Sequence, residues 1–274
     1  MRSISFVEKE NNIKRKSFSN FFLQFRNYLE YNLYESNNFL KINNYIFKKS
    51  LSSSNSHIFM IDNDTFIKEL DIEYNKKLIL RLSKIEFLII NINNKLIYSG
   101  RKSQFTNNIQ SYDYKQRVDE EIFIQIFTFK NNLSPDFFCY NYDLNKKFSL
   151  IMIMEYIEPQ YFLNNIFLID KNEIIFNPPN GYDFATIKKL FFESITKLHK
   201  LNIIHNDLIF INSFKYCIRN SYIDTNTNNV KFIDFGLSYI IDNEDVHSDE
   251  AKKFEIEYIE AFFNQIYDYC IKVS

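Results

Sequence analysis

The sequence contains few of the residues that mark unusual backbone geometry or metal chemistry. Its 274 residues include three Gly, four Pro, three Cys and no Trp. The cysteines are far apart and show neither a CxxC pair nor a Cys/His ligand spacing, so we expect free thiols in a reducing compartment. No apolar run approaches the roughly 18–20 residues that cross a bilayer. The N-terminus also lacks a signal-peptide pattern, so we expect a soluble, cytoplasmic protein.

The charges of the chain nearly cancel, with 33 Lys and Arg against 34 Asp and Glu. The total charge therefore gives no reason to expect a nucleic acid or an anionic membrane as an obligatory partner. The unusual feature is the aromatic content, 30 Phe and 19 Tyr, amid abundant Asn, Ile and Lys. These residue types share AT-rich codons, which are typical of a parasite or a large DNA virus. For a virus, the cytoplasm would be that of the host cell.

The first 76 residues have a mixed pattern. The aromatic-rich stretch 18–34 has helical character, and the serine cluster 51–57 is typical of a loop with His57 exposed to solvent. We expect residues 1–76 to be an N-terminal extension of unknown role, where a protein partner could bind.

From residue 77, short apolar runs separated by polar pairs predict strands. Three runs, 77–82, 85–92 and 96–100, follow one another closely and predict an antiparallel meander. A helical stretch at 112–129 and a further strand at 148–154 come next. Residues 77–155 are therefore expected to form a small, strand-rich lobe with one helix.

The rest of the chain, 156–274, is expected to be mostly helical. Asp183 can cap a helix whose apolar residues recur at helical spacing and form one buried stripe, namely Phe184, Ile187, Leu190, Phe191, Ile195 and Leu198. Short strands at 213–218 and 230–234 and a terminal helix at 250–271 complete the prediction. Together the two lobes predict an α+β fold.

Two nearby segments carry residues that phosphoryl transfer requires. The first runs from Leu198 to Asn212 and reads LHKLNIIHNDLIFIN, and the second, VKFIDFGLS, follows at 230–238. Transfer of a phosphoryl group needs a carboxylate beside the attacking hydroxyl, ligands for metal ions that bridge the phosphates, and cations near the developing charge. The two segments supply the first two of these in the required order.

The pattern HxDLxxxN, followed by an apolar strand and Asp-Phe-Gly, resembles the catalytic and metal-binding loops of the protein kinase superfamily. The resemblance implies that Asp207 is the catalytic base and that Asn212 and Asp234 hold Mg²⁺. It also implies that His205 braces the catalytic loop. A lone HxD would fit ordinary turn residues as well, but its combination with Asn212 and the DFG sequence favours a nucleotide and metal site.

The strand that ends in Met154 and Glu155 resembles the strand and hinge that join the two lobes of a kinase. The resemblance implies a bilobal protein-kinase-like fold, with a small β-rich N-lobe containing one helix and a shortened, mostly α-helical C-lobe. ATP and Mg²⁺ would bind between these lobes. Met154 would take the gatekeeper position, and the backbone at Glu155 and Ile157 would contact adenine.

The cation that holds the ATP phosphates is less well defined by the sequence. Lys102 shares one face of its strand with Gly100, which leaves room for a nucleotide above the glycine. Arg101 and Lys95 are alternatives, and an ordinary solvated charge explains Lys102 equally well.

The acidic partner of this cation is expected on the helix at 112–129. Glu120 is favoured, with Glu121 as the neighbouring alternative, because the apolar residues after Glu120 then form an inward stripe. The stripe consists of Phe123, Ile124 and Phe127. Here too a solvated charge is an equally good explanation.

Several features depart from the protein kinase pattern. The glycines are limited to Gly100, Gly181 and Gly236, so the glycine-rich loop that covers ATP phosphates is missing. Ile209 stands where Ser/Thr kinases usually carry a phosphate-contacting Lys. Residues 237–274 are too few for the usual peptide-docking part of a C-lobe. In these respects the chain resembles minimal kinases such as that of the KEOPS tRNA-modification complex, with Glu255 replacing the usual Asp of the last helix.

The resemblance therefore implies an ATP-dependent phosphotransferase, with a minimal or atypical protein Ser/Thr kinase as the leading hypothesis. Two alternatives stay open. The missing glycine loop and short C-lobe favour a pseudokinase that only binds partners. The sequence His-Asn-Asp-Leu is also frequent in choline, ethanolamine and aminoglycoside kinases, for which the substrate would be a small-molecule alcohol instead of a protein.

Overall fold

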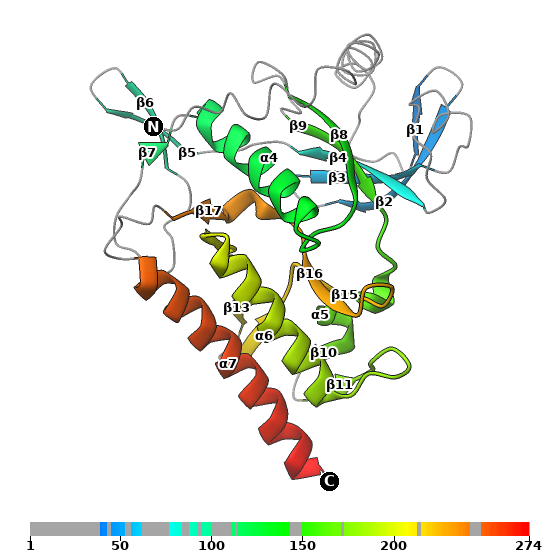
Figure 1. The fold of residues 1–274 in the computed structure, drawn as a ribbon. Helices are drawn as coiled ribbons and strands as arrows, with labels where there is room; N and C mark the ends of the chain where they lie inside the picture. Colours follow the sequence, from blue (N-terminus) through cyan, green and yellow to red (C-terminus); the bar gives the residue numbers. More distant parts are fainter. Residues whose placement is uncertain are drawn as a thin grey trace. The chain divides into compact units, whose positions relative to one another are not determined.

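The computed structural model describes residues 39–42, 45–52, 56–61, 77–83, 88–92, 95–99, 111–112, 114–142, 150–170, 173–212, 215–241 and 248–273. Both helices and small sheets are present (Figure 1), which confirms the predicted α+β class. Contacts divide the chain into two compact units, Met1–Glu86 with Asp136–Tyr156 and Phe87–Pro135 with Ile157–Ser274. The lobe boundaries expected after residues 76 and 155 stay a prediction.

The first unit contains one antiparallel sheet of six strands in the order β1-β2-β3-β4-β9-β8. Its strands are β1 Phe39–Ile42, β2 Tyr45–Ser52, β3 Ser56–Ile61, β4 Leu78–Ser83, β8 Phe137–Tyr142 and β9 Leu150–Glu155. Three of these strands come from the segment expected to be an N-terminal extension. The helix expected at 18–34 and residues 53–55 of the serine cluster lie outside the described residues.

The serine cluster expected to be a loop lies partly within this sheet. Leu51 and Ser52 end β2, and Ser56 and His57 begin β3. The loop prediction is wrong for these four residues. The strand formed by the apolar residues after His57 begins earlier, within the polar segment, so that His57 already pairs with Leu82.

The two faces of β4 differ in character. One face is completely buried and carries Leu78, Leu80 and Leu82. The other carries Ile79 and Arg81, which are half-buried. In the ladder with β9, Ile79 pairs with Met154 and Arg81 pairs with Met152. Because paired residues point to the same side and alternate residues share a face, Arg81 and Met154 lie on one face of the sheet.

The predicted meander of three consecutive strands is right for only two of them. β5 Leu88–Ile92 and β6 Lys95–Ser99 form an antiparallel hairpin, to which β7 Ser111–Tyr112 adds a short third strand. β4 lies instead between β3 and β9. All residues of β9 are buried, and its pairing with β4 buries side chains across the two strands, which closeness in sequence alone does not determine.

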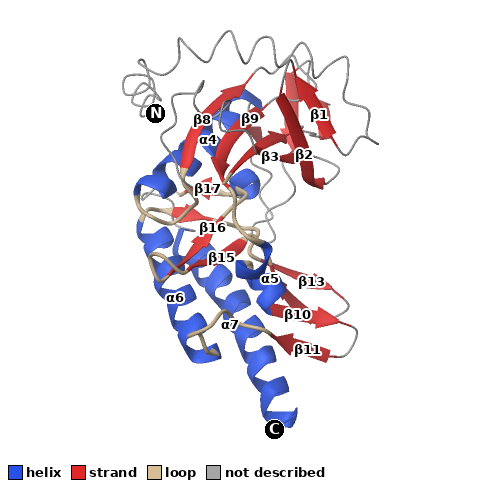
Figure 2. Cartoon of the chain, turned by 90° about the vertical axis from the view of Figure 1, so that its right-hand side faces the viewer, coloured by secondary structure: helices blue, strands red, loops and turns tan. Residues whose placement is uncertain are grey.

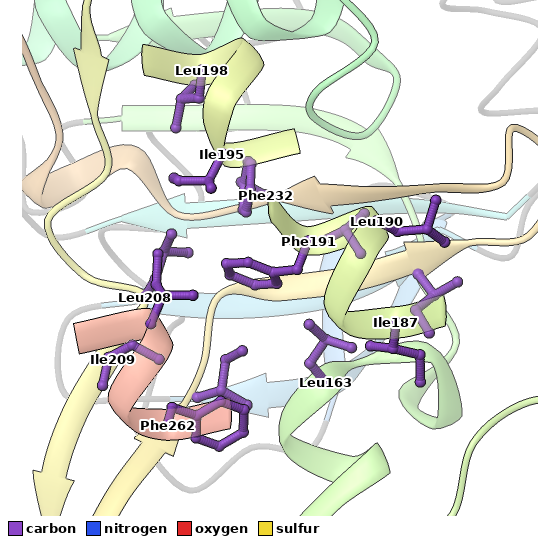
Figure 3. Close-up of a cluster of buried hydrophobic side chains, with 14 of the residues drawn as sticks. Leu163, Ile187, Leu190, Phe191, Ile195, Leu198, Leu208, Ile209, Phe232 and Phe262 are labelled. Atoms are coloured by element: carbon purple, nitrogen blue, oxygen red, sulfur yellow. The ribbon is translucent and has the colours of Figure 1, made fainter. Parts of the chain in front are cut away.

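The second unit is built around two long helices, α6 Phe184–Lys200 and α7 Ser248–Val273, which lie side by side in Figures 1 and 2. The predicted cap of α6 is confirmed, because Oδ1 of Asp183 accepts a hydrogen bond from the amide of Thr186 at 2.7 Å. The predicted stripe from Ile187 to Leu198 is buried. Figure 3 shows these side chains packing against residues of other elements, including Phe232 and Phe262.

Shorter elements complete the second unit. They are the helices α4 Tyr114–Lys130 and α5 Leu163–Ile166, and the antiparallel strand pairs β10 Phe167–Asp170 with β11 Glu173–Phe176, β12 Ile203–Ile204 with β17 Tyr239–Ile240, β13 Ile209–Asn212 with β14 Lys215–Ile218, and β15 Ser221–Asp224 with β16 Asn229–Phe232. The helices predicted at 112–129 and 250–271 are confirmed as α4 and α7. Within the described stretches, no helix combines the length and apolar composition needed to cross a bilayer.

Candidate active site

Asp207 lies in the loop between β12 and β13, and two side chains that follow β14 bind its carboxylate. The guanidinium of Arg219 donates from Nη2 to Oδ1, and the amide of Asn220 donates from Nδ2 to Oδ2 at 2.9 Å. The side chain of Asp207 is 13% exposed. Each carboxylate oxygen can accept more than one hydrogen bond, so the pair still has room for a further donor such as a hydroxyl group.

Asn220 connects Asp207 with the segment that leads to Asp234. Its Nδ2 also donates to the backbone oxygen of Asp207 at 2.9 Å, and its own backbone oxygen accepts from the amide of Ile233 at 2.9 Å. Asn220 adopts a left-handed backbone with φ of 55°, which Asn tolerates better than most residues. Its side-chain oxygen accepts no hydrogen bond from the described residues, which leaves that oxygen available as a ligand.

Asn212, which the sequence spacing selects as a metal ligand, lies at the other end of the hairpin. It is the exposed last residue of β13 and pairs with Lys215. At about 3.3 Å per residue, the extended strand carries it roughly 10 Å beyond Ile209. The structure thus brings Asn220 to Asp207, and the metal role of Asn212 stays a prediction from spacing.

His205 joins the Asp207 loop to the segment around Asp234. Its side chain is completely buried, and Nε2 lies 2.9 Å from the backbone oxygen of Ile233. A carbonyl oxygen can only accept, so Nε2 carries the proton. The backbone oxygen of His205 accepts from the hydroxyl of Ser238 at 2.9 Å. These bonds, together with the pairing of β12 and β17, hold the two segments in register.

Glu255 of α7 fixes the backbone of the same loop. Its Oε1 accepts from the amide of Asn206 at 2.7 Å, and its Oε2 accepts from Nε2 of His199 at 2.7 Å and from the amide of His205 at 3.4 Å. Glu255 is 3% exposed. A carboxylate this deeply buried needs such donors, so Glu255 and the loop backbone constrain each other.

Asp234 follows β16 and adopts a left-handed backbone with φ of 60° and ψ of 66°. A short 3-10 turn, Phe235–Leu237, comes directly after it. A Cβ atom placed on Gly236 would lie 3.5 Å from Oδ1 of Asp234 and 3.7 Å from Oε2 of Glu121. Gly236 therefore lies beside two carboxylates, that of Asp234 directly before the turn and that of Glu121 on α4.

The two acidic candidates on α4 contact different parts of this segment. Oε1 of Glu120 accepts a hydrogen bond from the amide of Ile240 in β17 at 3.0 Å. Glu121 is the residue whose carboxylate lies beside Gly236. Glu120, favoured by the sequence as the partner of Lys102, thus has a backbone partner, and its role toward a nucleotide stays a prediction.

Burial and charge act in opposite directions on Asp207. Burial raises the pKa of its carboxyl group above the ordinary 3.8, the positive charge of Arg219 and the charge that His205 carries when protonated oppose this rise, and the negative charge of Asp234 adds to it. Burial lowers the pKa of His205, although the surrounding carboxylates oppose this effect. Burial therefore disfavours the charged form of both side chains.

The residues expected to contact adenine lie where β9 ends. Met154 is 4% exposed and Glu155 is 8% exposed, and Oε2 of Glu155 accepts from the amide of Asp136 at 3.2 Å. Ile157 is half-buried and is the residue at which the chain passes into the second unit. Lys102, together with Gly100 and Arg101, lies outside the described residues.

Asn220 and Asp234 each carry side-chain oxygen atoms of the kind that Mg²⁺ binds. This ion prefers oxygen ligands and usually takes only one or two carboxylates from the protein, because nucleotide phosphates and water fill its other positions. In the described part of the chain, no three His, Cys, Asp or Glu residues gather as they would around an ion held by protein alone. Two such side chains match the small number of ligands that a protein contributes to a Mg²⁺ ion held mainly by nucleotide phosphates.

Two residues of this site, Asn220 and Arg219, did not emerge from the sequence. The signal for Asn220 was its place directly before the short run Ser221–Asp224, which a turn of polar residues separates from the strand leading to Asp234. Such a pattern predicts a hairpin, but it does not place the residue before the hairpin beside Asp207. Arg219 carries no comparable sequence signal.

Comparisons with known proteins give no family for the chain. No model of a protein family matches it, and no curated protein is similar to it in sequence. Among solved structures, it is similar to the kinase PK-1 of the Cydia pomonella granulovirus, with 18% sequence identity and a TM-score of 0.41. The aligned region covers 71% of this chain and 54% of the viral kinase, so the chain spans about half the length of that protein.

Proposed function

We propose that the chain is an ATP-dependent phosphotransferase of the protein kinase type, with Asp207 as its catalytic base. The observation that carries this proposal is the pair of hydrogen bonds from Asn220 to Asp207. They join Asp207 to the residue directly before the β15–β16 hairpin, which leads to Asp234, and so link the proposed base to two side chains that we propose as metal ligands. A carboxylate base and metal ligands are two of the three kinds of group that phosphoryl transfer requires. The bilobal arrangement, ATP and Mg²⁺ belong to the same proposal.

In the proposed reaction, Asp207 orients the substrate hydroxyl and takes its proton as the oxygen attacks the γ-phosphorus. Asn220 keeps the carboxylate in one orientation, and Glu255 and His205 keep the surrounding backbone fixed. A bound Mg²⁺ would withdraw charge from the phosphates and align them. Asn220 and Asp234 are the ligands we propose for it, with Asn212 as the alternative from sequence spacing.

We propose Arg81, in addition to Lys102, as a candidate for the cation that binds the ATP phosphates. Arg81 is the charged residue of an otherwise apolar stretch of β4 and is half-buried. It shares a face of the sheet with Met154, the residue proposed to lie next to adenine. A guanidinium group is well suited to phosphate because its donors match the oxygen atoms in pairs.

The proposal is tested by incubating the purified chain with Mg²⁺ and ATP labelled at the γ-phosphate. Phosphate transfer to the chain itself, casein, choline and an aminoglycoside is measured for the wild type, Asp207→Ala and the surface control Asp268→Ala. We expect transfer to protein Ser or Thr by the wild type and Asp268→Ala only. Transfer to small alcohols alone would contradict the proposal that the substrate is a protein. A wild-type transfer rate no higher than that of Asp207→Ala would contradict the proposal that the chain is an enzyme.

A further inference from the structure

Phosphoryl transfer also requires a cation near the base, and the residue after Leu208 cannot supply it. Ile209 carries no charge, is 6% exposed and packs within the hydrophobic core in Figure 3. Its side chain points into the protein and stabilises the fold. The charge that balances the transferred phosphoryl group must therefore come from another element.

Arg219 reaches the base from the opposite strand of the β13–β14 hairpin. Its amide donates to the backbone oxygen of Leu208 at 2.8 Å, which extends the ladder one pair beyond Ile209 and Ile218. Its guanidinium lies 5.0 Å from the ring centroid of Phe210 and forms an ion pair with Asp207. Backbone pairing, an aromatic ring and a carboxylate together hold the charged group beside the base.

The hairpin itself is fixed on α7. Oε1 of Gln265 accepts from the amide of Tyr216 at 2.9 Å, and Nε2 of Gln265 donates to the backbone oxygen of Tyr216 at 3.0 Å. The amide group thus pairs with the outer edge of β14 as a neighbouring strand would. β14 is held on both edges, which fixes the backbone from which Arg219 projects and reduces the entropy lost when its side chain binds an anion.

The guanidinium group keeps donors for a further ligand. It has five N–H groups, and its bond to Asp207 uses Nη2. Its Nε is buried and has no hydrogen-bond partner among the described residues. The side chain as a whole is 36% exposed, so an anion can approach the rest of the group from solvent.

We propose that Arg219 is the cation that contacts the transferred phosphoryl group, in place of the charge that Ile209 lacks. The inference rests on the phosphotransferase function proposed above. A hydroxyl group bound to Asp207 lies about 3 Å from the carboxylate, and the phosphorus it attacks lies about 3–3.5 Å beyond it. The oxygens on that phosphorus are therefore close to a guanidinium that is bound to the same carboxylate.

In this step the hydroxyl oxygen forms a bond to the γ-phosphorus, and the bond from that phosphorus to the bridging oxygen breaks. The electron pair of the broken bond leaves with the nucleoside diphosphate, and the proton of the hydroxyl moves to Asp207. Arg219 forms and breaks no covalent bond. Its charge stabilises the negative charge on the three equatorial oxygens, which makes it a transition-state contact.

The test compares Arg219→Met and Arg219→Lys with the control Lys189→Met, whose lysine has a side chain 75% exposed on α6. We expect Arg219→Met to lower kcat for phosphate transfer by about 10²–10³-fold with little change in KM for ATP. Arg219→Lys should retain part of the rate, and Lys189→Met all of it. Arg219→Gln repeats the test should the Met variant not fold.

A second readout needs no turnover. Thermal unfolding is followed with Mg·ADP alone and with Mg·ADP plus aluminium fluoride, which mimics the planar transferring group. We expect both additions to raise the Tm of the wild type, with the larger rise for aluminium fluoride. Arg219→Met should respond to Mg·ADP as the wild type does and lose the extra rise.

The outcomes separate this inference from the function on which it rests. If the wild type transfers phosphate and Arg219→Met does so equally well, the inference is wrong and the function stands. If Arg219→Met recovers the full rate at higher pH, Arg219 only keeps Asp207 ionised, and the phosphoryl contact is again wrong. If the wild type neither exceeds Asp207→Ala nor responds to Mg·ADP, the function fails and the inference fails with it.

Discussion

The side-chain amide of Asn220 donates to both the backbone oxygen and Oδ2 of Asp207, each at 2.9 Å. The β13–β14 hairpin separates these two residues in the sequence, yet its strands return the chain to the loop where it began. The spacing of the kinase-like motif predicts Asn212 as a metal ligand, whereas we propose Asn220 because it contacts Asp207. The two assignments lead to opposite expectations for a matched pair of variants.

Asn220→Ala is expected to weaken activation by Mg²⁺ by about 10–100-fold, because it removes the proposed metal ligand and a hydrogen-bond donor to Asp207. Asn212→Ala is expected to keep the activation of the wild type. The measurement is the rate of phosphate transfer across a Mg²⁺ titration at fixed ATP. A normal titration for Asn220→Ala together with a shifted one for Asn212→Ala would support the assignment by spacing.

Glu255→Gln is expected to lower the free energy of unfolding by about 1.5–3 kcal/mol. The amide nitrogen that replaces one carboxylate oxygen would present N–H groups either to the amide of Asn206 or to the donors of His199 and His205, and the donors on that side would lack an acceptor. Urea unfolding measures the change. The control is Glu257→Gln on the same helix, whose exposed ion pair with Lys253 at 3.8 Å is worth about 0.3–0.5 kcal/mol.

The ion pair of Asp224 and Lys231 predicts a pH-dependent stability. Oδ2 lies 2.7 Å from Nζ, and the two side chains are 9% and 4% exposed. Burial raises the pKa of Asp224, but the bonds from Lys231, Thr227 and the amide of Asn226 outweigh it and hold the pKa below 3.8. A folded-state pKa below the unfolded value means that the pair stabilises the fold above pH 3.8 and loses this effect as the pH falls through the folded pKa.

Asp224→Asn should therefore cost about 3–5 kcal/mol near neutral pH, because it leaves a buried ammonium group without its carboxylate. The difference from the wild type should shrink as the pH falls below about 4, where the wild-type carboxyl group also becomes protonated. Chemical unfolding of both proteins at a series of pH values measures the loss of stability at neutral pH and its change with pH. A difference that stays constant down to pH 2 would contradict the depressed pKa.

Arg81→Met is expected to lower kcat/KM for ATP by about 10–100-fold, which corresponds to losing a charge-assisted hydrogen bond to phosphate. Lys253→Met, which removes an exposed charge of the second unit, serves as the control. Competition by a fluorescent ATP analogue measures affinity apart from turnover. If Arg81→Met binds the analogue as the wild type does, Lys102 becomes the cation to examine.

The sequence predicted those parts of the site whose signals are contiguous. The cap at Asp183, the stripe of α6 and the terminal helix depend on residues a few positions apart, and the DFG sequence needs no partner to be noticed. Asn220 could not be predicted in this way, because its place depends on the register of a hairpin inserted between it and Asp207. Register is set by pairing across strands, which no fixed spacing along the chain describes.

The choice between Glu120 and Glu121 shows the same limit. Neighbouring residues on a helix point about 100° apart, so a small rotation of α4 exchanges their roles. The amide of Ile240, 120 positions away in the sequence, binds Glu120 and helps to fix this rotation. Likewise, β4 pairs with β9 across more than sixty intervening residues, beyond the reach of the local pattern that predicted a meander.

Because of the β13–β14 hairpin, the geometry around Asp207 does not depend on how many residues the hairpin contains. It departs and returns at the paired residues Ile209 and Ile218, so residues added between Asn212 and Lys215 would lengthen only its far end. Each doubling of such a loop costs about 0.6 kcal/mol in closure entropy. A dye or an affinity tag inserted there would mark the protein while leaving Asp207 in its native surroundings.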